Sequence, residues 1–250
     1  MTAILQAVAG FDGLPVLVAA VFAAGMVRGF TGFGTALVYV PVAATVLPPV
    51  QVIVTIITFD ILGPLPVLPR ALREGDPREV ARLLPGAVVG LAAGLMLLTR
   101  LGPLTFRWMI CIVSLLLLLV LASGWRYRRA LGDVAKGAVG LVSGLFGGAA
   151  GAAGPPVILF YLGGTEPPAR IRANILLFLA VFDVFYLALL AWKDLLGAFP
   201  VALGLVLILP YALGVLAGQA AFDPARERAY RAVAYAVIAV AALGGLPVFD

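Results

Sequence analysis

The sequence predicts an all-α polytopic membrane protein built from two related halves. Hydrophobic residues fill 63% of the 250 positions and charged residues only 12%, and the mean hydropathy is +1.14. Soluble domains carry about 25% charged residues. A bilayer core about 30 Å thick requires roughly 20 apolar residues per spanning helix, and such runs recur along the whole chain. We therefore place the chain in lipid, with no room for a soluble domain between the runs.

Apolar stretches of spanning length define the expected helices. The uninterrupted stretches are Val50–Pro69, Val80–Leu98, Leu104–Ala122, Ile171–Trp192, Val201–Ala221 and Tyr230–Leu246. Two further apolar regions, Leu14–Leu47 and Val139–Leu162, are interrupted near the middle by glycines. We expect about eight transmembrane segments in all, with three continuous spans and one discontinuous or re-entrant region in each half.

The same features occur in the same order in both halves, which indicates an internal duplication. The segments GMVRGFTG at Gly25–Gly32 and GLVSGLFG at Gly140–Gly147 share three glycines at an offset of 115 residues (140 − 25). Further on, the Phe-Asp pair that ends at Asp60 recurs at Asp183, an offset of 123 residues (183 − 60).

The distribution of Lys and Arg over the short loops predicts the orientation of the chain. Cations gather at Arg70–Arg82, in the linker at residues 124–136 and at Arg226–Arg231, so we assign these three loops to the cytoplasm. The linker divides a first transmembrane repeat, residues 1–123, from a second, residues 137–250. If each glycine-broken region is re-entrant, each half crosses three times and the repeats are inverted, as in many transporters. If those regions cross fully, the repeats are parallel.

The glycine-broken regions are the main candidate for a binding site. Broken backbone within a bilayer must be buried in protein or line a cavity. A helix that starts after such a break points free N–H groups and the positive end of its dipole at the membrane interior, where they favour an anion. The candidate substrate-binding residues are Arg28, Gly29, Thr31, Gly32, Gly34 and Thr35 in the first half and Gly147, Gly148, Gly151 and Gly154 in the second.

The alternative role of these glycines is helix packing. Gly25, Gly29 and Gly32 are spaced i, i+4 and i+7, which creates a smooth helix face of the small-xxx-small kind. Gly90/Gly94 and Gly214/Gly218 lack flanking breaks, and for these pairs packing is the preferred interpretation.

Two acidic residues, Asp60 and Asp183, fall near the centres of their predicted spans. An ionised carboxylate there costs at least about 2.5 kcal/mol, so we expect a coupling role in which both carry protons. The alternative is a structural pairing with the backbone or with a cation such as Arg28. Arg28 is also a candidate for bidentate contact with an oxyanion, although Ser143 occupies the matching position of the second half.

Other features exclude several classes of chemistry. The sequence has no His, and its single cysteine, Cys111, lies in an apolar run, so we expect no metal site, no disulfide framework and no cofactor. The net charge of +5 comes from loop cations, so a nucleic-acid partner is not expected. The first ten residues have no Lys or Arg, so we expect no removable secretory signal. A Walker-type phosphate-binding run is lacking.

The ordered glycine and proline motifs resemble the sulfite exporter TauE/SafE family of membrane permeases. The resemblance rests on GMVRGFTGFGTALVYVP at Gly25–Pro41, on GLVSGLFGGAAGAAGPP at Gly140–Pro156, and on the runs that begin at Pro85 and Pro210. The sequences GFGTA and GGAAGAAG depart from the commoner GxGGG form. The resemblance implies movement of a small sulfur-containing anion, such as sulfite, a sulfonate or sulfoacetate.

The expected function is therefore secondary transport of a small anion by alternating access, driven by an ion gradient and coupled to protons. We expect a multi-pass protein of the bacterial cytoplasmic (inner) membrane, not an enzyme, whose partners are the anion, protons and lipid; the sequence is compatible with a homodimer. One alternative is a passive anion channel. Another is an intramembrane hydrolase that uses Asp60 and Asp183 as a dyad, which the lack of a Gly-Asp motif disfavours.

Overall fold

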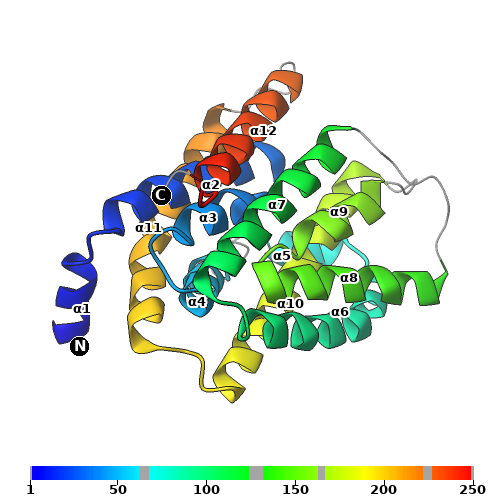
Figure 1. Cartoon of the computed structure of the whole chain (residues 1–250). Helices are drawn as coiled ribbons and strands as arrows, with labels where there is room; N and C mark the ends of the chain where they lie inside the picture. Colours follow the sequence, from blue (N-terminus) through cyan, green and yellow to red (C-terminus); the bar gives the residue numbers. More distant parts are fainter. Residues whose placement is uncertain (1, 62–67, 124–131, 163–166, 222–226, 249–250) are drawn as a thin grey trace.

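The fold is a bundle of α-helices, seen here in a computed structural model that describes residues 2–61, 68–123, 132–162, 167–221 and 227–248. All regular elements in those ranges are helices, which confirms the all-α prediction (Figure 1). In chain order they are α1 (Thr2–Ala9), α2 (Leu14–Thr31), α3 (Thr35–Ala43), α4 (Pro49–Asp60), α5 (Leu68–Glu74), α6 (Pro77–Leu98), α7 (Pro103–Ala122), α8 (Asp133–Ala150), α9 (Gly154–Leu162), α10 (Pro168–Trp192), α11 (Ala198–Ala221) and α12 (Glu227–Gly244).

The described helices include five that are long and apolar enough to cross a membrane. They are Leu14–Thr31, Pro77–Leu98, Pro103–Ala122, Ala169–Trp192 and Ala198–Ala221. Four of them coincide with continuous stretches expected from the sequence. The count of eight segments, the inversion of the repeats and the loop orientation stay predictions; Arg126, Arg128, Arg129 and Arg226, which contribute to the orientation argument, lie outside the described residues.

The expected span Val50–Pro69 is wrong as a continuous helix. Helix α4 ends at Asp60, and the next described helix begins at Leu68. The sequence continues past Asp60 with Gly63-Pro64. Pro64 lacks the backbone N–H that a continuing helix would donate to the Asp60 carbonyl, and a proline disfavours helical geometry in the residue before it, so this apolar run overestimates the helix. Asp60 consequently lies at the end of a helix and not in the interior of one.

Both predicted glycine breaks are present and have the same kind of C-cap. The first helix of each pair ends at a glycine in the left-handed region, with φ of 80° at Gly32 and 68° at Gly151. The N–H of Gly32 donates to the Arg28 carbonyl, and that of Gly151 donates to the Gly147 carbonyl, each at 2.7 Å. This bond is typical of the αL motif, and at the second break the N–H of Ala152 also donates to the Phe146 carbonyl, at 3.2 Å. A residue with a Cβ adopts the left-handed conformation only with strain. Gly34, with φ of 97°, is the N-cap residue that precedes α3.

The helix boundaries correct the register of the duplication. Gly151 follows Gly32 by 119 residues (151 − 32), and α8 begins 119 residues after α2 (133 − 14). The sequence offset of 115 is therefore about one helical turn short, because glycines that recur every three or four residues match themselves when shifted by a turn. In the corrected register the counterpart of Arg28 is Gly147, not Ser143.

Glycine faces join the two halves. A methyl group at Gly29 of α2 would lie 2.6 Å from the Val215 carbonyl oxygen of α11, and one at Gly148 of α8 would lie 2.5 Å from the Leu91 carbonyl oxygen of α6. These contacts are equivalent, because Val215 follows Leu91 by 124 residues (215 − 91), the offset between the two glycine pairs of α6 and α11. The packing role expected for those pairs is confirmed, and each half contributes a helix to the other.

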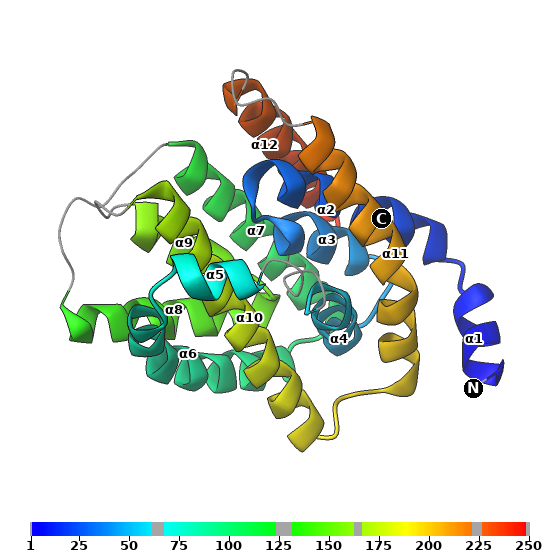
Figure 2. The same cartoon turned by 180° about the vertical axis from the view of Figure 1, so that it is seen from behind.

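The helices form two groups (Figures 1 and 2). The first bundle contains α2, α3, α4, α11 and α12, and the second bundle contains α5, α6, α8, α9 and α10. Helix α7 lies between them and packs against α12, α3 and α9, while α4 contacts α10 directly. The α4–α10 contact is thus a junction between the bundles.

Substitution at Gly144 tests the glycine packing. A Cβ at Gly144 would meet the Ala87 backbone of α6, whereas one at Gly137, on the same helix, would meet nothing within 4 Å. We expect Gly144→Ala to lower the free energy of unfolding by about 1–3 kcal/mol through overpacking. Gly137→Ala should preserve or raise it, because alanine favours a helix by about 1 kcal/mol over glycine. Thermal unfolding in detergent measures both, and equal stability of the two variants would contradict the packing.

Candidate functional site

An ion pair between Arg28 and Asp60 forms the centre of the site. Arg28 lies in the last turn of α2 and Asp60 is the last residue of α4. Nη1 of Arg28 donates to both carboxylate oxygens of Asp60, at 2.5 and 2.7 Å. The two side chains are only 14% and 16% exposed. A charge withdrawn from water requires an opposite charge and hydrogen-bond partners. Each of the two residues supplies the counter-ion that the other needs.

Two hydroxyl groups complete this arrangement. Tyr211 of α11 donates its hydroxyl to Oδ1 of Asp60 at 2.5 Å. Thr35, the first residue of α3, accepts from Nη1 of Arg28 at 3.3 Å and lies 3.2 Å from the Tyr211 hydroxyl. We call these four residues, Arg28, Thr35, Asp60 and Tyr211, the Arg28 cluster. It brings together four helices of the first bundle.

Sequence reasoning missed Tyr211. The signal that could have found it is its spacing, because Tyr211 precedes Gly214 by three residues and so shares the helix face that packs against α2. A methyl group at Gly25 of α2 would indeed meet the Tyr211 carbonyl oxygen at 2.5 Å. A tyrosine on a glycine face is placed where its hydroxyl can reach across the helix pair.

Asp183 approaches the cluster from the second bundle. It lies in the interior of α10, is 6% exposed, and interacts electrostatically with both Arg28 and Asp60. Among the described residues it forms no hydrogen bond or ion pair. The site therefore has two carboxylates and one guanidinium, and the two carboxylates come from opposite sides of the junction between the bundles.

The remaining candidates of the first half lie around the break. Gly32 is exposed, and a Cβ there would meet nothing within 4 Å. The Thr31 hydroxyl lies 2.8 Å from the carbonyl oxygens of both Val27 and Phe33 and can donate its one proton to either, so it binds the backbone of the break itself. Gly29 packs against α11. Helix α3 starts beside the cluster and directs the positive end of its dipole toward it.

The candidates of the second half make packing contacts, and the Tyr186 hydroxyl donates a hydrogen bond to the Gly148 carbonyl, at 2.6 Å. Gly147 packs against the Phe182 ring, and Gly148 packs against α6. A Cβ at Gly151 would lie 3.3 Å from Cδ1 of Ile53 in α4, and Gly154 has only aliphatic atoms nearby. Polar candidates thus converge at the first break and not at the second; a binding role for the second-half glycines stays a prediction.

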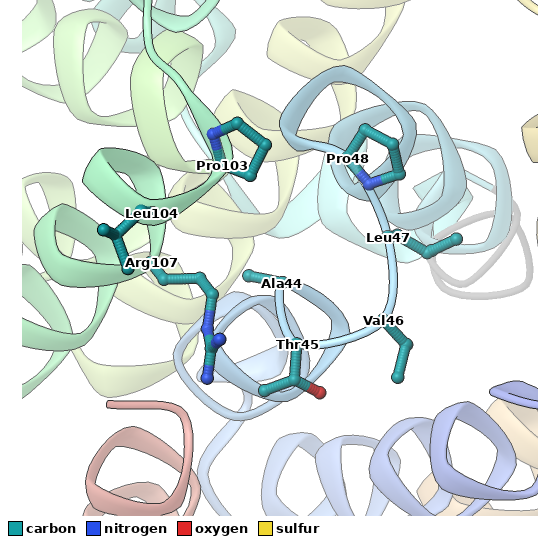
Figure 3. A pocket seen from close by; sticks show the side chains of 8 residues that line it. All are labelled: Ala44, Thr45, Val46, Leu47, Pro48, Pro103, Leu104 and Arg107. Atoms are coloured by element: carbon teal, nitrogen blue, oxygen red, sulfur yellow. The ribbon is translucent and has the colours of Figure 1, made fainter. Parts of the chain in front are cut away.

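The Arg28 cluster lies apart from the two described pockets. One pocket, of about 400 Å³, is formed by the α3–α4 turn and the start of α7 (Figure 3). Its lining residues are Ala44, Thr45, Val46, Leu47, Pro48, Pro103, Leu104 and Arg107. The other lies between α6 and α10. Within the described residues, no group of three or more acidic, cysteine or histidine side chains is arranged to hold a metal ion.

A double-mutant cycle tests the ion pair. We expect Arg28→Gln and Asp60→Asn each to lower the free energy of unfolding, because each leaves a partly buried charge without its partner. The double variant should recover part of the loss, with a coupling energy of about 0.5–3 kcal/mol between the two sites. Denaturant or thermal unfolding in detergent gives the values. Additive effects would show that the two charges do not stabilise one another.

Comparison with known proteins identifies the family of the chain. No curated protein and no solved structure matches it. A sequence model of one family, described as "Sulfite exporter TauE/SafE", matches residues 17–244. That range includes both glycine breaks, the Arg28 cluster and Asp183. The chain belongs to the sulfite exporter TauE/SafE family of membrane permeases.

Proposed function

We propose that this permease is a secondary transporter that moves a small oxyanion, such as sulfite or a sulfonate, across the bacterial cytoplasmic membrane. The observation that carries the proposal is the Arg28 cluster, where a guanidinium and two hydroxyl groups converge beside the N-terminus of α3. Charge-assisted hydrogen bonds from arginine suit the paired oxygens of carboxylates, sulfonates and sulfite. The family match supports transport as the activity.

Alternating access is the mechanism we propose. The junction between the bundles passes between Asp60 on α4 and Asp183 on α10, so a movement of one bundle against the other changes the separation of the two carboxylates. The two breaks also differ, because Gly32 is exposed while Gly151 faces Ile53. In duplicated transporters alternating access moves one repeat against the other around the site. On this mechanism Gly151 would become exposed, and Gly32 covered, in the conformation that is open to the opposite side of the membrane.

The hydrolase alternative gains no support from the geometry. The carboxylate of Asp60 accepts hydrogen bonds from Arg28 and Tyr211, whereas a carboxylate dyad shares its proton directly between the two acids.

Uptake of ³⁵S-labelled sulfite into proteoliposomes tests the site. We expect Arg28→Gln to reduce saturable uptake at least tenfold and Arg28→Lys to reduce it less, because lysine keeps the charge but loses the planar fork. The matched control is Arg100→Gln, since Arg100 is exposed between α6 and α7. Uptake in Arg28→Gln at the control level would contradict the proposal. Saturation and counterflow by the unmodified protein separate a carrier from a passive channel.

Proton coupling is tested at Asp183. We expect Asp183→Asn to abolish accumulation driven by a pH gradient while anion exchange continues, because exchange needs no net proton transfer. The control is Asp194→Asn, because Asp194 is exposed after α10 and has a φ of 53°, which asparagine also tolerates. Accumulation that keeps its pH dependence in Asp183→Asn would assign Asp183 a structural role.

A further inference from the structure

We infer that Asp60 occupies the place of the substrate, as an internal ligand that a monoanionic oxyanion displaces from Arg28 and Tyr211. The inference rests on the proposed function and specifies both the class of substrate and the origin of its proton dependence.

The hydrogen bonds of the cluster support this assignment. Both carboxylate oxygens of Asp60 accept from Nη1 of Arg28, and Oδ1 also accepts from Tyr211. Thr35 lies within hydrogen-bond distance of both donors. A guanidinium and the Tyr211 hydroxyl bound to a pair of oxygens, with Thr35 hydrogen-bonded to both donors, form a site for a carboxylate, a sulfonate or bisulfite. In this conformation the two oxygens in the site are those of the Asp60 carboxylate.

The position of Asp60 allows its release. It is the last residue of α4, followed by the C-cap residue Ile61, and the last turn of a helix opens at lower cost than its interior. Arg28 and Asp60 keep some exposure. Gly32 lies one turn beyond Arg28 on α2, and the space around it is open to a Cβ. An anion arriving at the break therefore reaches the donors of Arg28 without moving a helix interior.

Charge balance then requires a proton. The described site has one cation, Arg28, and two carboxylates, Asp60 and Asp183. A monoanion that pairs with Arg28 leaves both carboxylates without a counter-ion, which a low-dielectric environment opposes. One proton bound by Asp183 for each monoanion restores the original charge. A dianion would require a second proton, so the site favours monoanions.

Anion binding to purified protein tests the inference, with methanesulfonate as the probe and dimethyl sulfone as its uncharged analogue. Between pH 6 and pH 8 we expect the affinity of the unmodified protein for methanesulfonate to fall about tenfold per pH unit, as one linked proton requires. At pH 8, Asp60→Asn should bind at least tenfold more tightly than the unmodified protein, because the internal competitor is weakened. Asp194→Asn should bind as the unmodified protein does.

Equal or weaker binding by Asp60→Asn would overturn the inference. If that variant does not fold, proton uptake in weakly buffered solution decides: about one proton per bound anion supports displacement, and none contradicts it. Failure of the proposed function is a different result, namely no uptake of sulfite or methanesulfonate into proteoliposomes that hold the unmodified protein.

Discussion

A charged side chain inside a bilayer must be paired, and the Arg28–Asp60 ion pair is the interaction on which the rest of this site depends. The pair joins the end of α2 to the end of α4, and its hydrogen bonds extend to α3 through Thr35 and to α11 through Tyr211. It therefore defines where four helices of the first bundle meet. The pair also makes the two halves of the site unequal. The residue of the second half that is equivalent to Arg28 is Gly147, which has no side chain to carry a charge.

Glycine packing allows the helices around this site to approach one another closely. Helices α2 and α11, and likewise α8 and α6, approach so closely that a methyl group would overlap backbone atoms of the partner helix. In a membrane, where apolar surface gains nothing from leaving lipid, such close contact is the main attraction between helices. The equivalent contacts at offsets of 119 and 124 residues show that the two halves share one architecture, while the side chains at their breaks have diverged.

The sequence predicted the all-helical class of fold and both glycine breaks because those depend on local chemistry. The length of an apolar run and a cluster of glycines can be read directly from the sequence. A carboxylate within an apolar run indicates that the folded protein supplies it with a cation or hydrogen-bond donors. The end of α4 was misplaced because hydropathy does not register the effect of proline on the helix before it. The repeat register was misplaced because the glycine pattern is nearly periodic. Tyr211 was missed because its role arises from a contact with Asp60, 151 residues earlier in the chain, and the sequence indicates only that it shares a helix face with Gly214.

The central claim is that the donors of Arg28 and Tyr211 form the substrate site and that Asp60 holds it in the absence of substrate. The most direct measurement is an experimental structure of the protein with a bound sulfonate that carries a heavy atom. We expect sulfonate oxygens within hydrogen-bond distance of the Arg28 guanidinium and the Tyr211 hydroxyl, with the Asp60 carboxylate moved away. A sulfonate bound elsewhere, with the Arg28–Asp60 pair intact, would contradict it.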